Sequence, residues 1–115
     1  MPYTVNKKQT YESDAQALFQ AVLGAVEGLQ GEVEEQDAAA GTVQAKFDKK
    51  IHGKVLGDRT RLHVQIDNSG HGASELSLEI YPIDPVGRKL QFGARKGVAQ
   101  QVVTWFLAHV EHRLA

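Results

Sequence analysis

Apolar and polar residues alternate along three segments in the middle of the chain, residues 42–51, 59–67 and 74–81. The apolar positions of this alternation are Val43, Ala45, Phe47, Ile51, Leu62, Val64, Ile66, Leu76, Leu78 and Ile80. A period of two is that of a strand with one buried face. A sheet buried on both faces would instead carry continuous apolar runs. The alternation therefore predicts a mostly antiparallel sheet with one apolar face and one solvated face.

Turn-forming residues separate these strands. Segments containing glycine at 37–41, 52–58 and 68–72 predict turns, the last of them a hairpin loop. Pro82 and Pro85 are expected to end the third strand, because proline cannot donate a hydrogen bond to the ladder. Weaker patterns predict three short strands, at residues 2–9, at 32–36 and from Leu90 to Phe92.

Two segments have helical periodicity. Apolar side chains recur at helical spacing in residues 14–30, and Ser13 with Gln16 has the sequence of a capping box at the start of this helix. Gly31 is expected to stop it. Residues 95–114 predict a second amphipathic helix. Its periodic positions hold Val98, Val102, Trp105, Phe106, His109 and Val110.

The elements follow in the order β-α-β-β-β-β-α, with the short strand near Leu90 before the last helix. This order predicts an α+β fold of two layers, in which a mostly antiparallel sheet of about five strands carries both helices on its apolar face. The 115 residues are expected to form a single domain, 1–115. The order resembles one repeat of the TATA-binding-protein fold. It also resembles small START-like, helix-grip domains, in which a curved antiparallel sheet wraps a C-terminal helix; neither resemblance implies a functional residue.

Composition and charge narrow the functional classes. The chain has no cysteine, which excludes disulfides and thiolate chemistry, and its net charge of −1 disfavours a general nucleic-acid binder. Residues 1–45 carry two basic and seven acidic groups, whereas residues 46–115 carry eleven basic and seven acidic groups. No apolar run approaches the ~20 residues that a membrane span needs. Residues 1–10 lack the apolar core of a signal peptide, so a cytoplasmic location is expected.

Aromatic and aliphatic side chains near the last helix are candidates for a ligand pocket between that helix and the sheet. The candidate pocket residues are Leu90, Phe92, Trp105 and Phe106. The alternative is that these side chains fill the core, since protein interiors pack to a density of about 0.75.

A basic, glycine-containing connection precedes the last helix. Its candidate anion-binding residues are Arg88, Lys89, Arg95 and Lys96. Glycines allow close approach of a backbone to a ligand, and cations near a helix start suit a phosphate or carboxylate. The alternative is a flexible connection in which the glycines serve turns.

Small residues form a stripe along the first helix, and this stripe is a candidate interface. Its members are Ala17, Ala21, Gly24 and Gly28. Glycine in a helix interior costs about 1 kcal/mol relative to alanine, so a close neighbour is expected to compensate. That neighbour is either a partner, including a second copy of this chain, or the domain's own second helix.

The sequence contains no motif for catalysis or for a cofactor. No Gly-x-Ser-x-Gly segment is present, and His109 and His112 lack a third metal ligand at a recognisable spacing. We therefore expect no enzyme activity, no cofactor and no metal site. The first hypothesis is a non-catalytic protein-interaction module. The alternatives are a binder of a small apolar or amphipathic ligand, and an anion or nucleic-acid binder that uses the basic connection together with the solvated sheet face.

Overall fold

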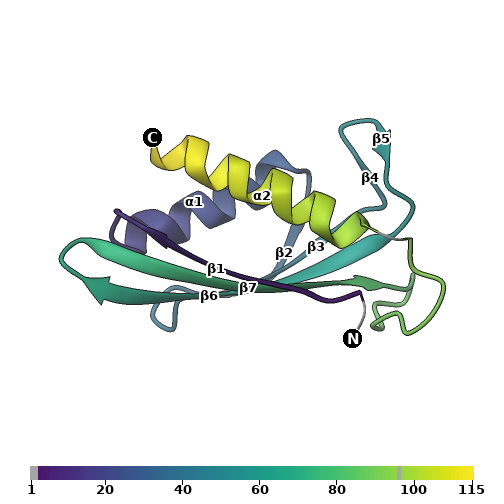
Figure 1. The fold of residues 1–115 in the computed structure, drawn as a ribbon, viewed down its shortest axis with the longest axis horizontal. Coiled ribbons are helices and arrows are strands. Elements are labelled where there is room, and N and C mark those ends of the chain that lie inside the picture. The colour runs from purple at the N-terminus through teal and green to yellow at the C-terminus, as the bar shows by residue number, and fades with distance from the viewer. Residues whose placement is uncertain (1–2, 96) are drawn as a thin grey trace.

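The computed structural model describes residues 3–95 and 97–115. The elements that it describes are β1 (Val5–Tyr11), α1 (Ala15–Gly28), β2 (Glu32–Asp37), β3 (Thr42–Phe47), β4 (Lys50–Ile51), β5 (Lys54–Val55), β6 (Arg59–Gly70), β7 (Ala73–Ile83) and α2 (Val98–Leu114). Five strands form an antiparallel sheet in the order β1-β7-β6-β3-β2, and β4 and β5 form a separate hairpin. Both helices lie on one face of the sheet (Figure 1). The predicted two-layer α+β fold is confirmed.

The alternation in sequence becomes the two faces of the sheet. Along β3, along β6 as far as Ile66, and along β7 every second residue is buried. The buried set contains the predicted apolar residues of these strands and, in addition, Thr60, Ser74, Pro82 and Ile83. The predicted apolar side chains pack under both helices with Leu18, Val22, Val26, Val102, Phe106 and Val110, all fully buried. The core therefore lies between the sheet and the helix pair.

The two helices pack against each other as well as against the sheet. Strands β1 and β2 lie at opposite edges, so α1, which connects them, crosses the sheet. Helix α2 runs beside α1 (Figure 1). A Cβ built on Gly24 would come within 2.8 Å of the Arg113 side chain, and one on Gly28 within 2.9 Å of His109. These glycines therefore allow the close approach of α2.

Helix α1 begins and ends differently from the prediction. Asp14, rather than Ser13, is the N-cap, and its carboxylate accepts a hydrogen bond from the Ala17 N–H at 2.7 Å. The carboxylate also suits the positive end of the helix. The Ser13 carbonyl instead accepts a hydrogen bond from the Ser74 hydroxyl. At the other end Gln30 takes the left-handed conformation, with φ +61°, and the Gly31 N–H closes the helix on the Val26 carbonyl.

The segment predicted as one strand, 42–51, is divided after Phe47. The chain turns at Asp48 and Lys49, and the Lys49 carbonyl accepts the Leu56 N–H at 2.7 Å. Residues 50–55 therefore leave the main sheet as the small hairpin β4–β5, which turns at His52 and Gly53 (Figure 1). Alternation continues across this break, so periodicity alone could not locate it.

Three other predictions about where strands and loops lie were wrong. Strand β7 continues through Pro82 to Ile83, because the ring nitrogen and the carbonyl of Pro82 both face away from β6. On that side β1 has already ended, and the Pro82 carbonyl accepts a hydrogen bond from the Leu90 N–H. Residues 90–92 form no strand, and only Lys89 bridges to Ile83. The predicted loop 68–72 shrinks to a turn at His71 and Gly72.

Candidate functional site

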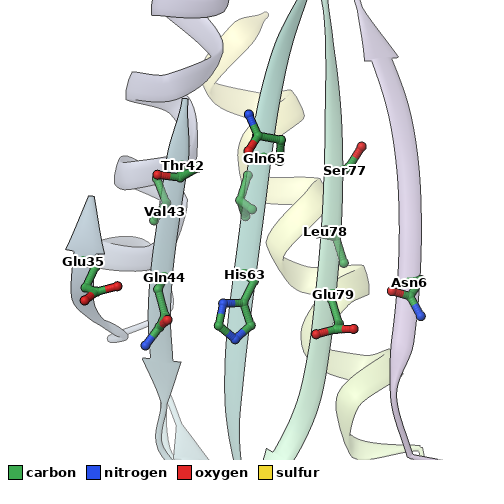
Figure 2. Close-up of a pocket in the computed structure, with 11 residues that line it drawn as sticks. Asn6, Glu35, Thr42, Val43, Gln44, His63, Gln65, Ser77, Leu78 and Glu79 are labelled. Carbon is green, nitrogen blue, oxygen red and sulfur yellow. The ribbon is translucent and has the colours of Figure 1, made fainter. Parts of the chain in front are cut away.

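A shallow hollow lies on the outer, solvated face of the sheet (Figure 2). Its volume is about 410 Å³. One transverse row of directly paired residues crosses the hollow and takes one member from each strand. In order from β2 to β1 the row is Glu35, Gln44, His63, Glu79 and Asn6. Figure 2 shows these side chains standing on the open face, with Thr42, Gln65 and Ser77 in the neighbouring row.

The hollow is a hydrogen-bonding surface. The eleven residues that line it include two glutamates and no lysine or arginine. The His63 ring is stacked on Tyr81, and its Nε2 lies 2.9 Å from the Tyr81 hydroxyl. Lys89 covers the Tyr81 ring, with its Nζ 4.6 Å from the centroid. Val43, Val64 and Leu78 also line the hollow, but each of these residues is almost fully buried.

An ion pair between Arg61 and Glu34 joins β6 to the edge strand β2. Arg61 on β6 donates from Nε to Glu34 of β2 at 2.9 Å and from Nη2 at 3.2 Å, and its Nη1 donates to the Gly87 carbonyl. Only 18% of the Arg61 side chain and 21% of the Glu34 side chain are exposed. The hydrogen bonds from Arg61 lower the pKa of Glu34 below its ordinary value of 4.5, against an opposing effect of burial. Gln44 donates to the same carboxylate.

Acidification is expected to weaken this ion pair. Because the pKa of Glu34 is lower in the folded chain, the stabilisation is fully present above the ordinary value of 4.5 and is lost as the pH falls through the lowered pKa. The free energy of unfolding of Glu34→Gln is therefore expected to fall less than that of the wild type between about pH 6 and about pH 3. Urea titrations at several pH values measure this difference.

A double-mutant comparison separates this pair from the other carboxylates. In an Arg61→Met background, Glu34→Gln is expected to change the pH dependence much less than in the wild type. Equal pH dependence of the wild type and Glu34→Gln would show that Glu34 is not held by Arg61 in solution.

A second hollow lies at one end of the helix pair and is mainly apolar. It has a volume of about 430 Å³. Three elements contribute to it: the end of α1, the β4–β5 hairpin and α2. The lining residues are Leu29, Ile51, His52, Lys54, Trp105, Ala108 and His109. We call this hollow the Trp105 groove.

The end of α1 holds the hairpin in place beside α2. The His52 ring lies with Nε2 2.5 Å from the Gly28 carbonyl, one of the last carbonyls of the helix. The His52 N–H donates to Oε1 of Gln30 at 2.9 Å. His52 itself adopts φ +49° in the turn of the hairpin. Ile51 is buried in the core, so the hairpin is anchored by this side chain as well as by the hydrogen bonds of His52.

The groove combines an apolar floor with a polar rim. Trp105 is only partly buried against the core, and Ala108 is exposed on α2. Lys54 lies over the Trp105 ring, with its Nζ 5.5 Å from the centroid. His52 and His109 are the other polar side chains of the lining. This arrangement suits a ligand with an apolar body and a polar or anionic end.

The four predicted pocket residues do not line one space. Phe106 is fully buried in the core, whereas Phe92 is 86% exposed in the connection before α2. Leu90 is partly buried in that connection, where its N–H donates to Pro82. Of the four predicted pocket residues, only Trp105 lines the Trp105 groove. The expectation that Phe92 faces inward is wrong, because residues 90–92 form no strand and Phe92 lies beyond the single bridge between Lys89 and Ile83 that the described residues show.

The hairpin side of the groove does not follow from the periodicity of the sequence. Periodicity predicts that Ile51 ends the strand 42–51 and that His52 and Lys54 lie in the loop after it. The sequence does contain a signal, since the turn pair His52-Gly53 stands between two dipeptides that each join a lysine to an aliphatic residue. A hairpin of two-residue strands is nevertheless too short for periodicity to detect.

The other predicted site residues are spread over two regions. Arg88, Lys89 and Arg95 lie in the connection between β7 and α2, and Lys96 lies outside the described residues. The Arg95 N–H donates to the Asp58 carboxylate at 2.5 Å. Anion binding by this connection stays a prediction.

The small-residue stripe of α1 is divided by the packing of α2. Gly24 and Gly28 lie beneath α2, Ala21 is buried, and Ala17 is exposed. The protein-interaction role assigned to this stripe stays a prediction.

Two features are absent from the residues that the structure describes. Residues 3–95 and 97–115 contain no group of three or more histidine or acidic side chains placed to hold a metal ion. None of the helices described is long and apolar enough to cross a membrane.

No family model matches the chain, and no curated protein matches it in sequence. Among solved structures, that of Ara h 8.0201 is similar with a TM-score of 0.67 and 14% identity, covering 97% of each chain. StfQ, a di-domain ARO/CYC of the steffimycin biosynthetic pathway, is similar with a TM-score of 0.62 and 11% identity, over 92% of this chain and 43% of StfQ. A START superfamily protein from Mycobacterium smegmatis has a TM-score of 0.53 and 8% identity, over 97% and 94% of the two chains.

These similarities show the fold alone. The chain has the START-like, helix-grip arrangement of a curved antiparallel sheet with a C-terminal helix, so the predicted resemblance to that class is confirmed. It spans less than half the length of StfQ.

Proposed function

We propose that the protein binds a small amphipathic ligand in the Trp105 groove, with the ligand's apolar body on Trp105 and an anionic group near Lys54. The observation that carries this proposal is the partly uncovered indole, which shares a mainly apolar hollow with Leu29 and Ile51. When a ligand covers a partly exposed aromatic side chain beside buried aliphatic residues, apolar surface is removed from water, and this burial favours binding.

The size and construction of the groove support the same function. Its volume of about 430 Å³ falls within the range of about 300–1,000 Å³ found for small-molecule sites. The hairpin wall is held by His52 on the end of α1, so the groove exists before a ligand arrives. The fold class supports a small-molecule role, since StfQ of the same fold belongs to a biosynthetic pathway.

Fluorescence of Trp105, the single tryptophan of the chain, tests the proposal directly. Titration with decanoate is expected to give a saturable shift of the emission to shorter wavelength, because the alkyl chain replaces water on the indole. Ala108→Phe fills the groove from an exposed position of α2 and is expected to abolish the response. Thr104→Phe adds the same ring at an exposed position of α2 outside the lining and is the matched control.

Lys54 provides the second test. Lys54→Met keeps the aliphatic stem and removes the charge, so it is expected to weaken decanoate by about twofold to fivefold and to leave decanol unchanged. The proposal is overturned if the emission does not respond to decanoate, or if Ala108→Phe titrates like the wild type.

A further inference from the structure

The exposed large hydrophobic side chains of the described residues gather at one end of the molecule. They are Val55 with 70% exposure, Val86 with 76% and Phe92 with 86%. Val55 belongs to the β4–β5 hairpin, and the other two belong to the connection between β7 and α2. Figure 1 shows both segments at the same end, and the hydrogen bond from Arg95 to Asp58 joins the connection to the base of the hairpin.

The same two segments are basic. Residues 49–59 and 84–95 contain seven basic groups, of which five are exposed, and two acidic groups. The basic residues are Lys49, Lys50, Lys54, Arg59, Arg88, Lys89 and Arg95. The two acidic residues hold the backbone: Asp84 accepts hydrogen bonds from the N–H groups of Val86 and Arg88, and Asp58 accepts one from Arg95. Because the whole chain has a net charge of −1, the remainder of the molecule is acidic.

We propose that this basic end docks on an anionic lipid bilayer. Phe92 and Val86 enter the interface between headgroups and acyl chains, and the surrounding lysine and arginine side chains contact lipid phosphates. Exposed apolar side chains in the same segments as cations are the combination that binds an anionic membrane surface, because burial and charge attraction then act together. The acidic remainder of the chain orients the molecule with this end toward the membrane.

Two observations favour a bilayer over a nucleic acid. Val86 and Val55 are branched aliphatic side chains without a face on which a base could stack, whereas both suit hydrocarbon. The turn around Asp84 fixes Val86 next to Arg88 through two hydrogen bonds, so apolar and basic groups stay together at the tip.

Sedimentation with vesicles tests the proposal. The wild-type protein is expected to bind phosphatidylcholine vesicles that contain phosphatidylglycerol and not vesicles of phosphatidylcholine alone. Phe92→Ser is expected to lower the partition coefficient about tenfold, since it removes an aromatic side chain from the interface. Arg88→Glu is expected to lower it by a similar factor of about ten. Lys7→Glu makes the same charge change on exposed β1 and is expected to alter binding by less than about twofold.

The outcomes separate this proposal from its alternatives. It is overturned if anionic vesicles do not bind, if Phe92→Ser binds as the wild type does, or if an oligonucleotide binds more tightly than the vesicles and displaces them. The proposal does not depend on the Trp105 groove. Ala108→Phe, which fills the groove, is therefore expected to bind vesicles like the wild type, so that either proposal can fail alone.

Discussion

Replacement of Phe106 by alanine is expected to lower the free energy of unfolding by about 3–5 kcal/mol. Phe106 has no exposed surface and lies between α2 and the sheet, packed with other fully buried side chains. Its removal leaves a cavity that neither α1 nor the paired strands can close, because both are fixed by their own contacts. Urea-induced unfolding followed by circular dichroism measures the change.

Phe92→Ala is the matched control for this prediction. It makes the same chemical change at a side chain that is 86% exposed, so it is expected to change the free energy of unfolding by less than about 0.5 kcal/mol. Similar losses for the two variants would contradict the placement of Phe106 in the core and of Phe92 on the surface.

Gly41→Ala is expected to lower the free energy of unfolding by about 2–4 kcal/mol. Gly41 closes the β2–β3 hairpin with φ +73°, a conformation that costs a side-chain-bearing residue about 1–2 kcal/mol. A Cβ at this position would also overlap the Ile66 carbonyl oxygen. That carbonyl belongs to the paired strand β6, and the Ile66 N–H is itself hydrogen-bonded to Gly41 at 2.7 Å, so the two backbones cannot move apart freely.

Comparison with Gly72→Ala separates the steric part of this cost from the conformational part. Gly72 has a φ of +77° in the β6–β7 turn, and a Cβ there would meet no atom within 4 Å. It therefore carries only the conformational cost and is expected to destabilise by about 1–2 kcal/mol. If both alanine variants unfolded at the same denaturant concentration, the contact of Gly41 with Ile66 would not limit the fold.

The β4–β5 hairpin connects the two proposals in space. Lys54 stands at the rim of the Trp105 groove, and its neighbour Val55 belongs to the exposed apolar set of the basic end. A ligand in the groove and a surface at the basic end would thus contact successive residues of one hairpin. The hydrogen bonds of His52 to the end of α1 hold this hairpin in place.

The amino-acid sequence by itself determined the main strands, the helices and the face that each strand buries. Periodicity is a local property: residues 42–47, 59–67 and 74–81 expose or bury alternate side chains wherever the sheet lies. The same helical spacing places Trp105 beside the core, against which it is partly buried, and its role as a ligand contact stays a prediction.

Tertiary structure alone decided where the Trp105 groove and the basic end are. Whether Phe92 lies inside or outside depended on pairing between the connection and β7. That pairing consists of the bridge between Ile83 and Lys89 and the hydrogen bond from the Leu90 N–H to the Pro82 carbonyl, and Phe92 lies beyond both. Gly24 and Gly28 of α1 could pack against a partner or against α2. The path of α2 decided this, because its Arg113 and His109 side chains lie over these glycines. The groove arises because His52 meets the end of a helix that is 24 residues away in sequence, at Gly28. Contacts between such distant residues leave no period in the sequence, so their geometry could not be predicted from it.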